Sequence, residues 1–220
     1  MTVSERDERH HPEANEEEWS FAWWDATVMS GGYTSYRLRR GGTSWYCWGW
    51  WRPERPLMHV VEFDIPRRAD PMIAKAEAMW AEYTCESPMN QWTIGNETHA
   101  VELDDPEEAL GRVHGTLVPM ASDLEWYATG ATVEIPDGYR QQGVLLGDVE
   151  TIEGRVEIAE CSSVRTHRWT TTSLSMDPFD VALAHLEARL PFRFPDGSVL
   201  DLVATPNGWA RRQEFAAPRR

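Results

Sequence analysis

The sequence has few cysteines, almost no lysine and no long apolar run. Its three cysteines, Cys47, Cys85 and Cys161, are widely spaced and form no C-x-x-C pair, which argues against a disulfide framework or a zinc knuckle. We expect them to act as small buried hydrophobic residues rather than as nucleophiles. The single lysine, Lys75, has an acidic neighbour, which does not favour a Schiff base. No apolar run approaches the roughly 20 residues of a membrane span, so we expect no membrane-spanning helix.

Positive charge is also scarce. The 220 residues include 21 basic and 36 acidic side chains, for a formal net charge of −15. Nucleic acid and anionic membrane surfaces are therefore not expected as partners, because both require a basic face. The polar N-terminus resembles neither a secretory signal nor a transit peptide, so a cytoplasmic location is expected. Residues 1–18 carry seven acids and are predicted to form a disordered tail in which His10 and His11 are solvated.

Familiar catalytic and cofactor motifs are missing. The chain contains no G-x-G-x-x-G, no Walker loop, no G-x-S-x-G and no H-E-x-x-H. His99 and His114 fall on different predicted strands, and the spacing suggests no third ligand beside them. The sequence therefore predicts neither a metal site nor an organic cofactor.

Tryptophan, in contrast, is abundant. There are twelve tryptophans, five of them between Trp19 and Trp48, and aromatic side chains bury about 150–250 Å² each. Two interpretations stay open: a core rich in indole rings, or an aromatic-lined pocket for a large apolar or cationic guest.

Short strands between Gly- and Pro-rich turns organise most of the chain. Aromatic and β-branched residues with a period of two, separated by turns such as Ser30-Gly31-Gly32 and Gly41-Gly42, predict an antiparallel meander. The third strand is apolar on both faces, as expected for a closed barrel or a sandwich. The predicted strands cover residues 19–28, 33–39, 43–51, 57–65, 79–85, 91–94, 98–103, 113–118, 124–127, 144–151 and 155–161.

The second half of the chain is predicted to differ from the first. The Pro/Gly break Ile135-Pro136-Asp137-Gly138 suggests a boundary between a β domain over 19–136 and a smaller unit over 137–220. A helix is predicted from Asp177 to Leu190, with an aspartate cap, a proline in the first turn and one apolar stripe. A last hairpin is expected to turn at Pro195-Asp196-Gly197.

Two positions could carry chemistry. Asp25 follows Trp23-Trp24, and a carboxylic acid among indole rings would have a raised pKa and could donate a proton. The alternative is an aspartate at a strand end that bonds its own turn. His167, within Arg165-Thr166-His167-Arg168-Trp169, could act as a general acid or base or anchor a polar ligand group. The alternative is a structural histidine.

Several segments resemble the lipocalin-like AttH/CrtC superfamily, which includes carotenoid 1,2-hydratases and Diels–Alderases. They are Trp19–Asp25, the Gly31-Gly32 turn, Met89–Trp92, Tyr139–Val144 and Arg165–Trp169, which together span about Trp19 to Thr170. Only Arg165, His167 and Trp169 carry over from that group's R-D-H-S-W-G-type segment. Only 82 residues remain from Tyr139 onward, so the second unit should be reduced.

The resemblance implies a mainly β, lipocalin-like barrel or sandwich with one C-terminal helix and a reduced second β unit. It also implies a cofactor-independent cyclase or hydratase for a hydrophobic polyene, terpenoid or polyketide. The alternative is a non-catalytic carrier of a lipophilic molecule. Asp25 and His167 are the candidate catalytic residues, and the oligomeric state stays open. The expected ligand-binding residues are Trp23, Tyr36, Trp48, Trp50, Trp92, Arg165 and Trp169.

Overall fold

A computed structural model describes residues 3–25, 27–28, 30–52, 55–104 and 114–174, together with the backbone of 189–193, 199–205 and 208–211. Apart from a short 3-10 helix, η1 (Glu5–Glu8), the regular elements of these residues are strands. The prediction of a mainly β protein is therefore confirmed. Within these ranges no helix has the length and apolar character needed to cross a membrane.

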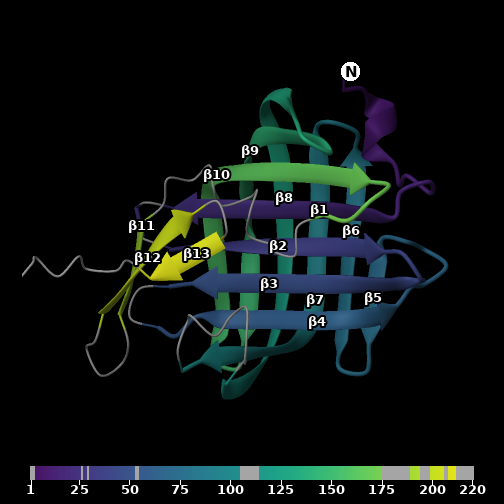
Figure 1. Ribbon diagram of the computed structural model, residues 1–220. Helices are drawn as coiled ribbons and strands as arrows, with labels where there is room; N and C mark the ends of the chain where they lie inside the picture. The colour runs from purple at the N-terminus through teal and green to yellow at the C-terminus, as the bar shows by residue number, and fades with distance from the viewer. Residues whose placement is uncertain are drawn as a thin grey trace, which may run out of the picture.

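Ten strands form one antiparallel sheet (Figure 1). Their spatial order is β4-β3-β2-β1-β10-β9-β8-β7-β6-β5. A separate three-stranded sheet contains β11 (Arg189–Arg193), β12 (Val199–Thr205) and β13 (Gly208–Arg211). The strands of the large sheet are β1 (Glu16–Asp25), β2 (Ser30–Arg39), β3 (Thr43–Trp51), β4 (Met58–Pro66), β5 (Ile73–Ala76), β6 (Met79–Ser87), β7 (Gln91–Leu103), β8 (Gly115–Ile135), β9 (Gly138–Thr151) and β10 (Gly154–Thr170).

The large sheet curls so that its two halves face each other. Strand β4 also pairs with β7, Met58 opposite Glu102 and His59 opposite Val101. In Figure 1, β10 and β1 to β4 run across β7, β8 and β9, which lie behind them. The faces that the two halves turn toward each other enclose the hydrophobic core.

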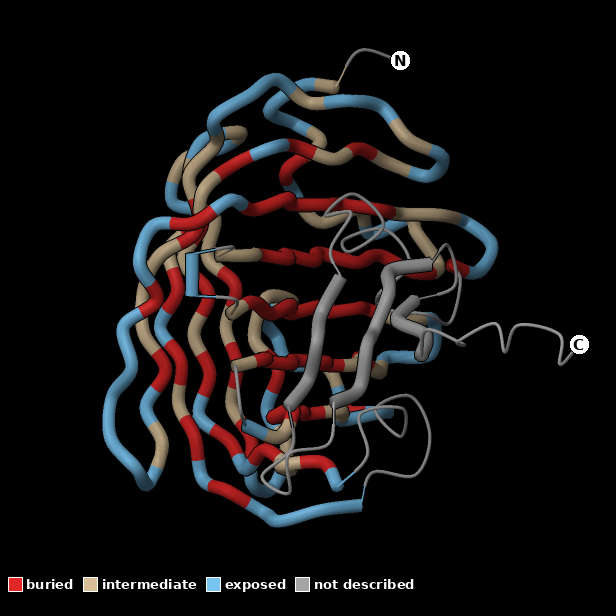
Figure 2. The backbone as a smooth tube through the Cα atoms, turned by 90° about the vertical axis from the view of Figure 1, so that its left-hand side faces the viewer, coloured by how far each residue is buried: buried red, intermediate tan, exposed pale blue. Residues whose placement is uncertain are grey.

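Residues at alternate positions of the strands fill this interior, as the period of two requires. On β1 the inward side chains include Trp19, Phe21 and Trp23, and the equivalent positions of β3 are Tyr46, Trp48 and Trp50. Figure 2 shows long buried stretches along the strands and exposed residues at their turns. The five aromatic residues expected to face inward, Trp23, Tyr36, Trp48, Trp50 and Trp92, all belong to this core.

Two glycines make room for interior indole rings. A Cβ at Gly32 of β2 would overlap the ring of Trp23, which pairs with Gly32 across the strands. A Cβ at Gly143 of β9 would overlap the ring of Trp126 on β8. Each glycine therefore lets a large ring lie flat against the neighbouring backbone.

The outward face of β1 and β2 is buried as well, and around Glu18 it is polar. Glu18 accepts hydrogen bonds from Ser35 and Arg37, at 2.8 and 3.0 Å, and one from Arg168 of β10. Burial alone would raise the pKa of Glu18, but the two guanidinium groups outweigh it and lower the pKa. In β3, the strand for which the sequence predicts two apolar faces, the outward side chains Cys47 and Trp51 are buried too.

The N-terminal segment is not the disordered tail that its charge predicts. Residues Glu16–Glu18 begin β1, and Glu8 of η1 is 4% exposed. The acidic side chains are ordered because arginines and histidines of the sheet pair with them. Charge composition could not reveal these distant partners.

The expected boundary near residue 136 lies inside the large sheet. Pro136 and Asp137 form the tight turn between β8 and β9, and β9 pairs with both β8 and β10. Strands β9 and β10 thus belong to the same sheet as β1 rather than to a second unit. The sequence was also divided too finely: 91–94 and 98–103 form one strand, and Ser30–Gly32 belongs to β2 rather than to a turn.

The helix expected from Asp177 to Leu190 lies outside the described residues up to position 188. Its last two residues, Arg189 and Leu190, belong to β11. The final hairpin is confirmed by the antiparallel pairing of β11 with β12, although its turn at 195–197 lies outside the described residues.

Candidate functional site

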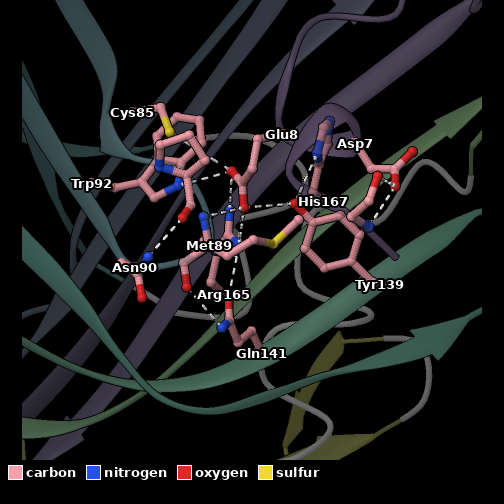
Figure 3. Close-up of polar contacts among 12 residues, drawn as sticks. Asp7, Glu8, Cys85, Met89, Asn90, Trp92, Tyr139, Gln141, Arg165 and His167 are labelled. Carbon is pink, nitrogen blue, oxygen red and sulfur yellow. Dashed lines mark hydrogen bonds and ion pairs between the residues drawn. The ribbon is translucent and has the colours of Figure 1, made fainter. Parts of the chain in front are cut away.

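A buried ion pair links the N-terminal segment to β10 at one end of the aromatic interior (Figure 3). Arg165 donates from Nη1 and Nη2 to the two oxygens of Glu8, at 2.8 and 2.5 Å. Both side chains are buried, Arg165 fully. Two parallel charge-assisted hydrogen bonds are the strongest arrangement available to an arginine and a carboxylate.

Neutral donors complete the surroundings of the Glu8 carboxylate. Trp92 donates its indole N–H at 3.1 Å, Tyr139 its hydroxyl at 3.0 Å, and the backbone of Met89 its N–H at 3.2 Å. Burial raises the pKa of Tyr139 even though Arg165 opposes it, so the phenol keeps its proton and donates it. The carboxylate thereby accepts hydrogen bonds from β7, β9, β10 and the turn before β7.

Aromatic faces surround the guanidinium of Arg165. Its Cζ lies 5.0 Å from the ring centre of Trp126, 5.3 Å from Tyr139 and 5.5 Å from Trp92. Rings at these distances attract a cation through their negative faces. The remaining N–H donors of Arg165 include one that reaches Gln141 Oε1 at 2.9 Å. The charged pair is thus embedded in the aromatic core rather than exposed to solvent.

Local structure brings Glu8 to this position. Ser4 and Asp7 brace η1, because the Ser4 backbone N–H and hydroxyl both donate to the Asp7 carboxylate, at 2.7 and 2.9 Å. The chain then reaches the sheet, where the Asn15 N–H donates to the Thr170 carbonyl at 2.8 Å. Both ends of the segment that carries Glu8 are therefore held in place.

A second buried carboxylate, Glu17, lies beside the first and is surrounded by imidazoles. His167 Nε2 is 2.9 Å and His11 Nδ1 is 2.8 Å from Glu17 Oε1. His10 Nδ1 contacts Glu17 Oε2, and the His11 backbone N–H donates to the same oxygen at 2.9 Å. Burial alone would raise the pKa of Glu17, but its hydrogen bonds with His11 and His167 lower it to about 2.

His167 connects the two carboxylates. Its ring stacks on Trp19 at 4.7 Å between ring centres, and its Nδ1 lies 3.4 Å from the Tyr139 oxygen. Burial lowers the pKa of His167, against the opposing effect of Glu17. Because Tyr139 donates its proton to Glu8, its oxygen is free to accept the N–H from His167. The chain of contacts thus runs from Glu8 through Tyr139 to His167 and Glu17.

Four of the residues predicted for the site belong to this cluster or contact it. Arg165, His167 and Trp92 are members, and Trp169 stacks on His11 at 4.1 Å between ring centres. The other aromatic residues predicted to bind the ligand belong to the hydrophobic core: Trp23, Tyr36, Trp48 and Trp50.

Asp25 is placed apart from His167. His167 pairs with Trp19, and Asp25 ends β1 six residues farther on, roughly 20 Å along the strand. Asp25 is half-buried, and its Oδ1 accepts the backbone N–H of Thr27 at 2.8 Å. The structure therefore gives Asp25 the strand-end turn contact that was the alternative to a proton donor, and does not bring the two residues together.

Three pockets formed by described residues lie elsewhere. An open pocket of about 690 Å³ is lined by Lys75, Trp80, His99 and their neighbours, and two others of about 430 and 510 Å³ lie along β6 to β10. None of these three contacts the expected aromatic set. The expected pocket lined by Trp23, Tyr36, Trp48, Trp50 and Trp92 stays a prediction.

The core nevertheless contains polar groups that no protein acceptor satisfies. In the part of the chain that the structure describes, four buried indole N–H groups lack a hydrogen-bond partner: those of Trp19, Trp23, Trp48 and Trp126. Leaving a buried donor unpaired costs about 1–3 kcal/mol. Each buried donor of this kind calls for an explanation, such as an acceptor on a bound ligand or water.

The cysteines fit the prediction of unreactive thiols. None of the three forms a disulfide, and Cys47 and Cys161 are buried. Burial raises the pKa of Cys161 to about 12 and that of Cys85 to about 11, which leaves little thiolate at neutral pH.

Sequence reasoning missed Glu8, His11, Glu17 and Tyr139. One signal could have marked Glu8 and His11. Asp7-Glu8 and His10-His11 place carboxylates and imidazoles within five residues, a composition unusual for a solvated tail. Their partners lie on β9 and β10, more than 100 residues away.

The chain matches no protein-family model, no curated protein and no solved structure.

Proposed function

We propose that the protein binds a lipophilic small molecule within its aromatic interior and converts it by hydration or cyclisation without an organic cofactor. The observation that carries this proposal is the set of four interior indole N–H groups with no protein acceptor among the described residues, those of Trp19, Trp23, Trp48 and Trp126. All four belong to the hydrophobic core, and two of them contact the buried cluster of ionisable groups: Trp19 stacks on His167, and Trp126 lies against Arg165.

The donors specify the kind of molecule. A ligand that is mainly apolar would replace ring–ring contacts inside the core. Oxygen atoms on that ligand would accept the indole N–H groups and remove the penalty of leaving them unpaired. Polyenes, terpenoids and polyketides that carry a few hydroxyl or carbonyl oxygens combine both properties. The N–H groups would then provide orientation and the rings most of the affinity.

The rings also suit the chemistry. Indole faces stabilise positive charge that develops on a polyene during protonation or cyclisation. Arg165 occupies the faces of Trp92 and Trp126, so a second cation should form away from it because like charges repel. The far end of β1 carries Asp25. Asp25 is therefore the candidate proton donor, and His167 belongs to the anchoring end of the site.

The competing function is a carrier that holds the same class of molecule unchanged. One observation favours it: the Thr27 N–H donates to Asp25 at 2.8 Å, so the carboxyl group is engaged by its own turn rather than directed at a ligand. The two functions share the binding site and differ only in turnover.

Turnover of an acyclic polyene with terminal isoprenoid double bonds distinguishes them. The polyene is incubated in detergent micelles with substoichiometric protein, and the products are analysed by chromatography and mass spectrometry. The proposal predicts many equivalents of a product that is either one water heavier or an isomer of the substrate. Asp25→Asn should lower this turnover by about 10²-fold, as expected for the loss of a general acid.

The matched control is Asp123→Asn, because Asp123 is an exposed aspartate on β8, and it should turn over like the unchanged protein. Binding without turnover in every variant would favour the carrier. Full activity of Asp25→Asn would remove Asp25 from the mechanism and leave catalysis to the shape of the core.

A further inference from the structure

We propose that His11, Glu17 and His167 form a binding site for one divalent first-row transition-metal ion, with His10 as an adjoining donor. The ligand atoms of the three residues all lie within 4.8 Å of one another. His11 Nδ1 and His167 Nε2 approach the same oxygen of Glu17, at 2.8 and 2.9 Å. His10 Nδ1 contacts the other oxygen.

The donor types define the ion. Imidazole nitrogens with one carboxylate oxygen suit zinc, iron, cobalt or nickel in the divalent state, whereas calcium and magnesium prefer oxygen donors alone. Around tetrahedral zinc, with bonds of about 2.0–2.1 Å, neighbouring donor atoms are about 3.3–3.4 Å apart. The two imidazole nitrogens need to move only about half an ångström farther from the Glu17 oxygen, from 2.8 and 2.9 Å, to reach this spacing.

The surroundings orient His167 for this role. Tyr139 donates its hydroxyl proton to Glu8 at 3.0 Å, so its oxygen can accept the Nδ1–H of His167 at 3.4 Å. With its proton on Nδ1, a neutral His167 can offer the lone pair of Nε2 to an ion that binds between this nitrogen and Glu17. An outer hydrogen bond that fixes the tautomer of a histidine is the usual arrangement at metal centres.

Charge and rigidity favour the site as well. Glu17 and His167 are buried, and His11 is held by its stacking on Trp169 at 4.1 Å between ring centres. The neighbouring charges of Glu8 and Arg165 neutralise each other as an ion pair. Glu17 therefore remains the one negative charge directed at the three imidazoles, and a cation bound there would be compensated in part.

The alternative is a carboxylate that is satisfied by hydrogen bonds from protonated histidine, with no metal. The inference does not depend on hydration, cyclisation or the presence of a lipophilic ligand. It concerns the affinity of the folded protein for an ion, which can be measured directly.

The test uses the untagged full-length chain, stripped with a chelator and titrated with Co²⁺. Visible absorption bands report coordination by nitrogen and oxygen, and Zn²⁺ competition reports affinity. We expect one equivalent to bind, to be displaced by Zn²⁺, and to raise Tm. His11→Ala and Glu17→Gln should each weaken binding by on the order of 10²-fold, since even outer-shell changes cost 10–100-fold. His10→Ala should weaken it less.

The control is His99→Ala, because His99 is exposed on β7 and its loss should leave the titration unchanged. Far-UV circular dichroism of each stripped variant shows whether it is folded. His11 lies outside the sheet, in the segment between η1 and β1, so its variant tests ligation without altering a strand. The proposal is wrong if the folded protein binds no stoichiometric Co²⁺, or if His11→Ala and Glu17→Gln bind it like His99→Ala.

Discussion

Arg165 and Glu8 are 157 residues apart in the chain and form a two-point ion pair inside the sheet, at 2.8 and 2.5 Å. The pair joins the N-terminal segment to β10, which in turn pairs with β1. The first residues of the chain are thus part of the interior, and the buried cluster exists only when the N-terminal segment comes together with β7, β9 and β10.

Glu8→Ala should strongly destabilise the protein. Removing the carboxylate leaves the buried guanidinium of Arg165 without its counter-charge, a change that costs about 3–5 kcal/mol at buried pairs. Urea unfolding at neutral pH, followed by tryptophan fluorescence, measures the free energy of unfolding. Glu13→Ala is the control, because Glu13 is an exposed acid in the same segment. Equal stability of the two variants would mean that Arg165 finds another partner and that the pair is dispensable.

Much of the sheet could be predicted from the sequence, because its information is local. Thr43–Trp51 coincides with β3, and the alternation of large aromatic residues correctly placed Trp48 and Trp50 on the inner face. Glycine was the weaker guide. Ser30–Gly32 resembles a turn, but Gly32 lies within β2. A glycine stands at this position because a Cβ there would overlap the ring of Trp23.

The candidate site could be predicted only in part. Arg165, His167 and Trp169 were identified from one short segment, whereas Glu8, His11 and Glu17 were assigned to a solvated tail. The local mixture of acids and histidines marks the segment as unusual, but it does not show which acid pairs with a buried arginine. That difference depends on which strand lies beside β1, and the pairing of β1 with β10 is a property of the whole topology.

Acid should destabilise the outer face of β1 through Glu18. Its folded pKa lies below the ordinary value of 4.5 because Arg37 and Arg168 outweigh the effect of burial. The unfolded state then binds the proton more readily, so the stabilisation is complete above pH 4.5 and is lost as the pH falls toward the lowered folded pKa. Protein freed of metal ions with a chelator should therefore lose stability as the pH falls below 4.5.

Urea midpoints measured from neutral pH down to about pH 3 test this expectation. Glu18→Gln should be less stable at neutral pH and should lose less stability on acidification than the unchanged protein. Glu13→Gln serves as the exposed control and should follow the unchanged protein. Parallel pH profiles for Glu18→Gln and the unchanged protein would show that other carboxylates govern acid unfolding.

Gly32→Ala should destabilise the sheet, because the added methyl group would overlap both the Trp23 ring and the Gly49 carbonyl oxygen. Overpacking of this kind costs about 1–3 kcal/mol. Gly130→Ala is the matched change in β8, where the nearest atom, Gln142 Cβ, would be at ordinary contact distance, 3.6 Å. Chemical unfolding of both variants decides the point: if Gly32→Ala is as stable as Gly130→Ala, Trp23 can move without penalty.

Binding of a lipophilic probe shows whether the aromatic interior holds a ligand. The protein is titrated with cis-parinaric acid, a polyene whose fluorescence rises in apolar surroundings. We expect saturation at one equivalent. Trp48→Phe, which keeps a ring but removes an unpaired indole N–H, should weaken binding by about 2–10-fold, the value of one hydrogen bond. Trp45→Phe, on the outer face, where Trp45 donates to Asp64, should bind like the unchanged protein. A fluorescence signal that never saturates, or that is the same in all three proteins, would contradict a ligand site in the aromatic interior.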